Sequence, residues 1–189
     1  MLQKDKLVKL NVGCGQRKMH GFINIDARED VGPDMVANVA KIHEKFSDAD
    51  LLYACHVLEH FPLKPSTFQP ITWRQVLESW HATLKPGGVL RIAVPDIEAV
   101  CKYYVENGNF DILYAFFYGG QKYDFDFHYH CWSLDTLKRD LLDVGFKSVE
   151  RYNWKDTEHF YVDDYSQAYL PHMDKINGSL MSLNVEAIK

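Results

Sequence analysis

Histidine and acidic side chains are the residues of this chain best suited to catalysis. An imidazole titrates near neutral pH, which makes it a natural general base for a hydroxyl or amine group. Glu59-His60 directly follows a buried apolar run, and His128 and His130 lie in an aromatic segment that spans residues 110–132. We expect the catalytic residues to be His128, His60 and His130. A local structural pair of Glu59 and His60 is the alternative. The other candidates lack supporting neighbours: His20, His43, His81, His159 and His172.

A metal site is a second interpretation of the aromatic segment. His128 and His130 alternate with Asp124 and Asp126, and alternate residues of an extended segment point to the same side. No further ligands follow at a fixed spacing, as structural metal sites would require. We therefore expect no bound metal.

A glycine turn near the start of the chain predicts a ligand site. Residues 6–12 alternate between apolar and polar side chains, as a strand does, and Gly13 and Gly15 follow directly. Glycine lets the backbone bend and lets a ligand approach closely. In open α/β sheets, ligands lie outside the carboxyl ends of such strands. The turn therefore predicts a cofactor of the nucleotide type, although a two-glycine turn alone is a weak signal.

The next strand follows unusually soon. Residues 21–26 alternate and end in Asp26, so only about nine residues separate the two strands. Parallel strands usually need a crossover of about a dozen residues or more. The first crossover helix must therefore be very short or absent. Asp26 also comes earlier than the acid of a dinucleotide fingerprint, about 20 residues after the turn, which argues against an NAD-binding domain.

The rest of the chain alternates between strands and helices. Helices are expected after the capping residues Thr72, Asp96 and Ser133, and Leu84 continues the apolar face of the first of them. Further strands are expected at 34–39, 50–55, 89–94, 146–153 and 180–188, one or two helical turns at 41–46, loops at 27–34 and 62–70, and irregular chain at 154–178. This alternation indicates an α/β sheet in a single domain over residues 1–189, with helices on its faces.

Composition narrows the function classes. The chain has 189 residues, a net charge of −5 and 47% hydrophobic residues, which indicates a globular protein without a basic nucleic-acid surface. No stretch is apolar enough for a leader peptide or a membrane span. We expect a cytoplasmic protein with no nucleic-acid or membrane partner, and the oligomeric state stays open. The four widely spaced cysteines do not suggest zinc or disulfides.

Four motifs in order resemble those of class I S-adenosylmethionine-dependent methyltransferases. They are Leu10-Asn11-Val12-Gly13-Cys14-Gly15, the strand ending in Asp26, Val57-Leu58-Glu59-His60, and Leu84-Lys85-Pro86-Gly87-Gly88. The chain looks most similar to a small subgroup associated with polysaccharide genes. The resemblance implies a Rossmann-like sheet of seven strands in the order 3-2-1-4-5-7-6, with strand 7 antiparallel and the first crossovers shortened. It also implies S-adenosylmethionine as the cofactor.

The resemblance also assigns roles to single residues. Asp26 would hold the ribose hydroxyls, and Asn38 and the Val39 backbone would meet the adenine. The expected cofactor-binding residues are Asn11, Gly13, Cys14, Gly15, Arg17, Asp26, Asn38, Val39, Cys55 and His56. The subgroup has a Gly-Gly-Gln followed by an acid and a histidine, which correspond to residues 119–121, Asp126 and His128 and favour His128 over His130. The expected substrate-binding residues are Glu59, Gln121, Tyr118 and Asp126.

Two departures from the family pattern concern the same end of the cofactor. Arg17 occupies the position of the usual third glycine. The missing first helix also removes amides that would bind the cofactor carboxylate. Arg17 either replaces that charge or is a solvated surface residue.

Methyl transfer to a small acceptor is thus the expected function, with a sugar or glycan hydroxyl as one candidate and residues 110–132 as the cover over the substrate. The first alternative is a protein of the same fold that binds the cofactor without turning it over. The second is a nucleotide-dependent oxidoreductase.

Overall fold

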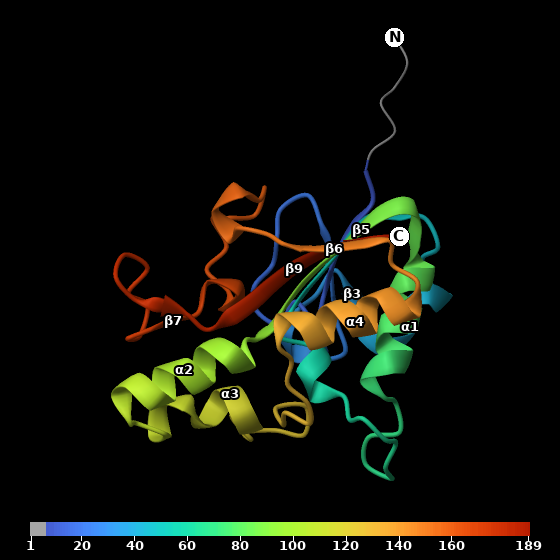
Figure 1. Cartoon of the computed structure of the whole chain (residues 1–189). Coiled ribbons are helices and arrows are strands. Elements are labelled where there is room, and N and C mark those ends of the chain that lie inside the picture. Colours follow the sequence, from blue (N-terminus) through green and yellow to red (C-terminus); the bar gives the residue numbers. More distant parts are fainter. Residues whose placement is uncertain (1–6) are drawn as a thin grey trace.

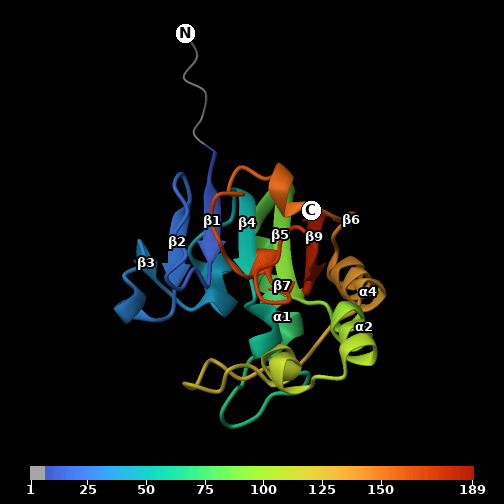
Figure 2. The ribbon, with the colours of Figure 1, turned by 90° about the vertical axis from the view of Figure 1, so that its left-hand side faces the viewer.

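The computed structural model describes residues 7–189, which form a seven-stranded mixed sheet. Its strand order is β3-β2-β1-β4-β5-β9-β6, and β9 is antiparallel to both of its neighbours. Figure 2 shows this order from left to right. The predicted strand order and the antiparallel last strand are therefore confirmed. The strands are β1 (Lys9–Val12), β2 (Ile23–Asp26), β3 (Met35–Val36), β4 (Ala49–Cys55), β5 (Leu84–Pro95), β6 (Ser148–Arg151) and β9 (Ser182–Ile188).

The two faces of the sheet are covered by different kinds of structure. On β4, Leu52 and Ala54 join the core beneath α1 (Trp73–Thr83) and α4 (Leu134–Val144), which lie side by side in Figure 1. Leu51 and Tyr53 instead pack with Met19, Phe22 and Val162 on the other face. That second face is covered by loop and short 3₁₀ turns, among them η5 (Trp154–Asp156) and η6 (Tyr165–Gln167). Because successive side chains of a strand point to opposite faces of the sheet, each strand contributes residues to the cores on both faces.

Two buried asparagines hold the connection that replaces the first crossover helix. The amide of Asn11 on β1 donates to Oδ1 of Asn24 on β2 and to the carbonyl of Arg17, both at 3.0 Å. Asn24 in turn accepts from the backbone N–H of Met19 at 2.7 Å and donates to Asp34 at 2.8 Å. Buried polar groups are stable only when paired. These contacts therefore fix a loop that lacks helical hydrogen bonds of its own.

The structure differs from the predicted element bounds in several places. The strand expected at 34–39 is only Met35–Val36, because the Asn38 side chain accepts from Ala40 N and begins η2 (Val39–Glu44). The helix after Thr72 ends at Thr83, and Leu84 begins β5. The region 154–178 contains the 3₁₀ turns η5 and η6 and part of the small hairpin of β7 (Tyr169–Leu170) and β8 (Ser179–Leu180). Residue 6 of the first predicted strand lies outside the described residues.

The further short helices are η1 (Glu29–Val31) and η3 (Leu58–His60).

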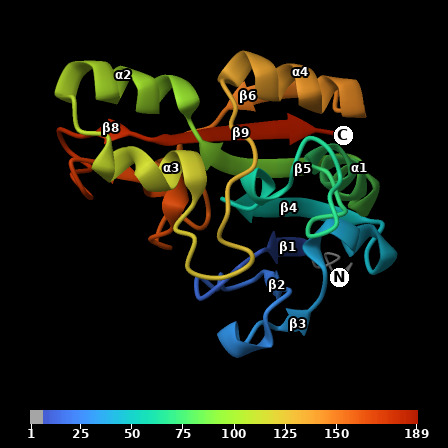
Figure 3. The ribbon, with the colours of Figure 1, turned by 90° about the horizontal axis from the view of Figure 1, so that it is seen from below.

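The aromatic segment crosses the carboxyl ends of the central strands. It follows α2 (Ile97–Asn107) and contains η4 (Asp111–Leu113) and α3 (Tyr114–Tyr118). Seen from below in Figure 3, the chain after α3 passes from the side of α2 toward β1 and β2 before it returns to α4. Leu113 anchors the segment in a small core with Val100 and Met181. Within residues 7–189, no helix is both long and apolar enough to cross a membrane.

A partly buried ion-pair cluster joins the irregular segment to the second face of the sheet. Arg91 of β5 donates to Glu158 and to Glu186, each at 2.7 Å, and to Nδ1 of His159 at 3.2 Å. Because a guanidinium only donates, His159 accepts at Nδ1 and is neutral. Burial, and then the charge of Arg91, lower the pKa of His159 to about 4 against the opposing effects of Asp164 and Glu158.

His159 should make the fold sensitive to mild acid. Its folded pKa lies below its ordinary value of 6.5, so the unfolded chain binds the extra proton between these values, and stability present above pH 6.5 is lost as the pH falls toward 4. The expected loss is up to about 3 kcal/mol. In His159→Phe, urea unfolding should show a shallower fall of the unfolding free energy between pH 6.5 and 4.5. Glu158, whose pKa is about 2, contributes only below that range. An unchanged slope in His159→Phe would contradict this assignment.

Candidate functional site

The glycine turn and Asp26 form one hydrogen-bonded unit at the carboxyl ends of β1 and β2. The Asp26 carboxylate accepts from Gly15 N at 2.8 Å through one oxygen and from Arg28 N at 2.9 Å through the other. Asp26 is almost fully buried. A carboxylate can accept about four hydrogen bonds. Each oxygen of Asp26 can therefore accept a hydrogen bond from one further donor.

Open space lies above one glycine of the turn and not the other. A Cβ added to Gly15 would meet nothing closer than the Arg28 guanidinium, 4.0 Å away. A Cβ added to Gly13 would overlap the Val57 side chain, which belongs to the loop after β4. Gly13 thus lets that loop approach β1, whereas Gly15 leaves room for a ligand.

The Cys14 side chain lies under the turn and is not reactive. The residue is buried, and its thiol lies 3.4 Å from the carbonyl of Gly15. Burial and then the charge of Asp26 raise the pKa of Cys14 to about 11. A protonated thiol is a poor nucleophile. Cys14 therefore contributes to the turn through its backbone and through the packing of its side chain.

Three other residues expected at the cofactor make hydrogen bonds within the protein. The Asn11 side chain is buried against Asn24 and the Arg17 carbonyl. Oδ1 of Asn38 accepts from Ala40 N, and the Val39 carbonyl accepts from the Trp80 indole at 2.9 Å. These bonds occupy one lone pair each, so both oxygens keep one.

Arg17 has an exposed side chain beside the glycine turn. Its backbone N–H donates to the Cys14 carbonyl at 2.8 Å, which closes the turn. Among residues 7–189, no ion pair of Arg17 is found within 4.0 Å. Either interpretation of this residue remains a prediction.

The loop after β4 begins with a strained residue. His56 has a left-handed backbone, with φ of 52°, which is uncommon outside glycine. Its Nδ1 lies 3.1 Å from Oε1 of Glu59, and its Nε2 lies 3.2 Å from the hydroxyl of Ser182 on β9. Cys55 precedes it and packs on the second face of the sheet, where burial raises its pKa well above the ordinary value. The turn thus directs the chain into η3.

Glu59 is the centre of a cluster with three imidazoles. The residue is fully buried, and Nε2 of His128 lies 3.9 Å from its Oε1. Burial alone raises the pKa of Glu59, but the imidazoles of His56, His60 and His128 outweigh it and lower the pKa to about 2. Burial lowers the pKa of His128 although Glu59 opposes this. Glu59 is therefore an ionised carboxylate at pH 7, and Nε2 of His128 faces it.

The structure separates His130 from this cluster. The His60 and His128 rings are 4.9 Å apart, whereas His130 packs on Trp132 at 4.3 Å and on Trp73 at 5.6 Å. Burial lowers the pKa of His130. Among the described residues, the group whose ligand atoms lie close enough to hold a metal is Glu59, His60 and His128. The aspartates of the alternative set, Asp124 and Asp126, are not in that group.

The Gly-Gly-Gln sequence and Asp126 form a turn that positions His128. The Asp126 carboxylate accepts from Gly120 N at 3.3 Å and from Lys122 N at 3.2 Å. Its backbone carbonyl accepts from Gln121 N at 2.9 Å. His128 N then donates to the Tyr118 carbonyl at 3.1 Å. The geometry of this loop therefore accounts for the spacing of these residues, and their predicted contact with substrate stays a prediction.

Tyr123 closes the other end of the aromatic segment over Arg28. The guanidinium lies 4.7 Å from the Tyr123 ring, within cation–π range. A hollow of about 450 Å³ opens there, beside Asp26, and is lined by Arg28, Asp30, Tyr123, Asp124 and Phe125. Neither Arg28 nor Tyr123 is among the residues predicted to bind the cofactor or the substrate. The sequence signal for Arg28 is its position, two residues after the strand-end acid.

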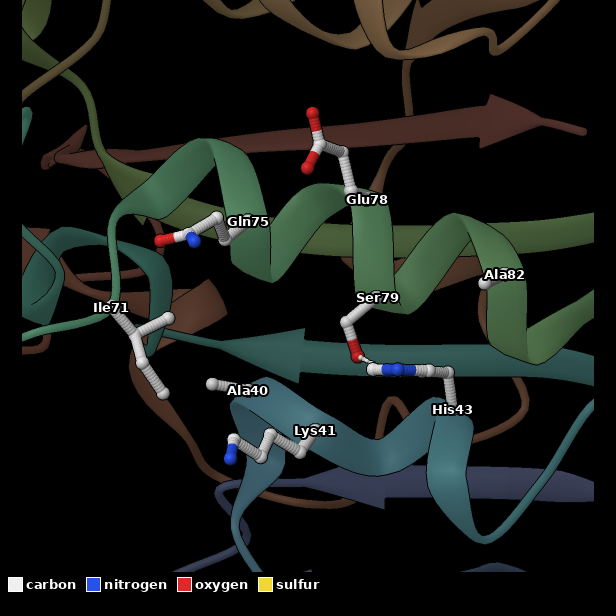
Figure 4. A pocket seen from close by; sticks show the side chains of 8 residues that line it. All are labelled: Ala40, Lys41, His43, Ile71, Gln75, Glu78, Ser79 and Ala82. Atoms are coloured by element: carbon white, nitrogen blue, oxygen red, sulfur yellow. Dashed lines mark hydrogen bonds between the residues drawn. The ribbon is translucent and has the colours of Figure 1, made fainter.

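A second hollow, of about 330 Å³, lies between α1 and η2, away from these residues. Figure 4 shows its lining, with Nδ1 of His43 2.7 Å from the Ser79 hydroxyl. The other lining residues are Ala40, Lys41, Ile71, Gln75, Glu78 and Ala82. None of the predicted site residues borders it, so it does not belong to the site at the carboxyl edge.

Comparison with known proteins finds similar folds among solved structures. A methyltransferase dependent on S-adenosylmethionine from Archaeoglobus fulgidus has 16% identity and a TM-score of 0.55, over 98% of this chain and 87% of its own. One from Mesorhizobium loti has 15% identity and a TM-score of 0.53, over 97% and 91%. A possible histamine N-methyltransferase from Thermotoga maritima has 12% identity and a TM-score of 0.57, over 96% and 82%.

No protein-family model and no curated protein matches the chain. At 12–16% identity, the similarity to these structures concerns the fold. The strand order and the antiparallel β9 agree with it. The chain therefore has the Rossmann-like fold of class I S-adenosylmethionine-dependent methyltransferases.

Proposed function

We propose that the chain transfers a methyl group from S-adenosylmethionine to a hydroxyl of a small acceptor. The observation that carries the proposal is the arrangement at one sheet edge. The Gly13–Gly15 turn and Asp26 lie at the ends of β1 and β2, and Glu59 lies just after β4, its neighbour. In this class of sheet, ligands bind outside the carboxyl ends of the strands.

The residues at this edge fit the proposed cofactor. Asp26 keeps acceptor capacity on both oxygens for the two ribose hydroxyls, and it would repel a 2′-phosphate. The space above Gly15 and the hollow beside Arg28 offer room without displacing main chain. When bound, S-adenosylmethionine would supply an electrophilic methyl group next to the loop after β4.

The chain's own residues would position the acceptor and receive its proton. An acceptor hydroxyl forms a new C–O bond and loses its proton as the methyl carbon leaves sulfur. The imidazole of His128 or of His60 would take up this proton, and Glu59, ionised and buried beside them, would stabilise the imidazolium that forms. The cover brings His128 to this point, and the burial of Glu59 strengthens these interactions.

A sugar is the acceptor class we favour. The cover exposes five aromatic side chains between residues 118 and 129, each more than a third accessible: Tyr118, Tyr123, Phe125, Phe127 and Tyr129. Aromatic rings at a site commonly provide apolar faces beside polar groups. A sugar offers both an apolar face and the hydroxyl to be methylated, which suits this surface.

Calorimetry with the full chain tests the cofactor. We expect one molecule of S-adenosylhomocysteine to bind per chain and NAD not to bind. Binding of NAD without S-adenosylhomocysteine would identify a nucleotide-dependent oxidoreductase and refute the proposal.

Turnover distinguishes an enzyme from a protein that only binds the cofactor. A panel of monosaccharides and oligosaccharides, assayed with methyl-labelled S-adenosylmethionine, should reveal a labelled product. Glu59→Gln should keep S-adenosylhomocysteine affinity within about threefold and lower transfer by at least 100-fold, the range of acid–base contributions. Binding without transfer to any acceptor would favour the non-catalytic alternative.

A further inference from the structure

Glu59 has an unusual environment for a buried carboxylate. Both of its oxygens are inaccessible, and neither meets a donor in hydrogen-bonding geometry, although Nδ1 of His56 lies 3.1 Å from Oε1. An isolated buried charge is costly, and such groups are normally paired or coordinated to a metal. The nitrogens of the neighbouring histidines therefore indicate whether Glu59 is paired with a cation or coordinated to a metal.

The two neighbouring imidazoles have their tautomers set by main-chain carbonyls. Nδ1 of His60 lies 3.0 Å from the carbonyl of Phe127, and Nδ1 of His128 lies 3.0 Å from the carbonyl of Phe116. A carbonyl only accepts, so each Nδ1 carries the hydrogen. In the neutral rings, each Nε2 is then left with a free lone pair. Metal-binding histidines almost always donate their other N–H in this way.

We propose that Glu59, His60 and His128 bind one divalent transition-metal ion. One ligand atom from each lies within 4.8 Å of the others, and ligands of a tetrahedral ion are about 3.4 Å apart when each bond is about 2.1 Å. Small side-chain rotations thus suffice. Two imidazoles and one carboxylate suit zinc, iron(II) or manganese(II), and leave positions open for other ligands.

His56 acts as a positioning residue in this site. Its Nδ1 faces Oε1 of Glu59, while its Nε2 is held by Ser182 of the neighbouring strand β9. The ring would thus orient the carboxylate toward the ion, as outer ligands of metal sites do. Its left-handed backbone places it there.

The ion would join two parts of the chain that are distant in sequence. Glu59 and His60 belong to η3 after β4, whereas His128 belongs to the aromatic cover. The cover already docks here, since Tyr129 N donates to the Glu59 carbonyl at 2.8 Å. The proposal that the ion binds here does not depend on the proposed function. Its further role, to bind the acceptor hydroxyl in an open position and favour loss of its proton, rests on that function.

Metal titration of the metal-free full chain, prepared without a histidine tag, tests the site. We expect one Zn²⁺ per chain by calorimetry, and visible absorption of coordinated Co²⁺. His128→Asn and Glu59→Gln should weaken Zn²⁺ binding by at least 100-fold, because loss of an outer-shell partner alone costs about 10–100-fold. His43→Asn is the matched control, since His43 lies in the hollow of Figure 4, and it should bind as the unaltered chain does.

The outcomes separate this site from the proposed function. No stoichiometric ion at 100-fold excess, or equal binding in His128→Asn, overturns the metal site. S-adenosylhomocysteine calorimetry is run on the same samples. If the chain binds S-adenosylhomocysteine but not the ion, only the metal site is refuted. If it binds the ion but not S-adenosylhomocysteine, only the proposed function is refuted.

Discussion

Asp26→Ala is expected to weaken S-adenosylhomocysteine binding by about 100-fold. The carboxylate can accept from both ribose hydroxyls while it holds Gly15 N and Arg28 N. Hydrogen bonds to a charged group contribute about 1.5–3 kcal/mol each, and every 1.4 kcal/mol changes affinity tenfold. Two lost bonds therefore correspond to at least 3 kcal/mol. Calorimetric titration of the purified variant measures the effect.

Two further variants show whether this loss comes from the ligand contact. Asp26→Asn keeps one acceptor oxygen for Gly15 N, so its affinity should fall between those of the unaltered chain and Asp26→Ala. Asp48→Asn removes an exposed charge before β4 and should bind normally. A drop in Asp26→Ala below threefold, with the fold intact by circular dichroism, would exclude Asp26 from the cofactor site.

Gly13→Ala is expected to destabilise the fold by about 3 kcal/mol. The new Cβ would overlap Cγ2 of Val57 and lie 3.3 Å from its Cγ1, and the backbone has φ of 67°. Overpacking of this kind costs about 1–3 kcal/mol, and the left-handed backbone adds about 1 kcal/mol for a residue with a Cβ. Urea unfolding gives the difference in the free energy of unfolding.

The chain contains a matched control for this effect. Gly21 has φ of 81°, and a Cβ there would meet nothing within 4 Å. Gly21→Ala should therefore cost only the backbone term. Val57→Ala should recover part of the stability of Gly13→Ala, which a double-mutant cycle can quantify. Equal losses in the two glycine variants would show that the approach of Val57 has no effect on stability.

The sequence predicted the elements whose signals are local. The capping residue Thr72 predicted the start of α1, and the structure shows both halves of a capping box formed by Thr72 and Gln75. The capping residue Ser133 predicted α4, whose Leu137 and Leu141 are fully buried. The resemblance of the four motifs to those of class I methyltransferases implied the strand order, and the structure confirms that order.

The loops that build the site could not be predicted in the same way. The sequence predicts that Gln121 and Asp126 contact substrate, and the structure adds that their hydrogen bonds close the turn before His128. A carboxylate that binds backbone amides and one that binds a ligand are the same residue type in a sequence. Only the positions of the amides of Gly120 and Lys122 distinguish the two roles.

By itself, the sequence determined the α/β class, the short first connection, and the placement of Asp26 at the end of its strand and of Glu59 after its strand. These follow from local periodicity, from the chain lengths between strands and from the parallel sheet they imply. Only the tertiary structure decided which histidines meet. His128 and His130 are two residues apart, yet one faces Glu59 and the other lies between Trp73 and Trp132. That choice depends on long-range packing of the cover against η3, which no local pattern encodes.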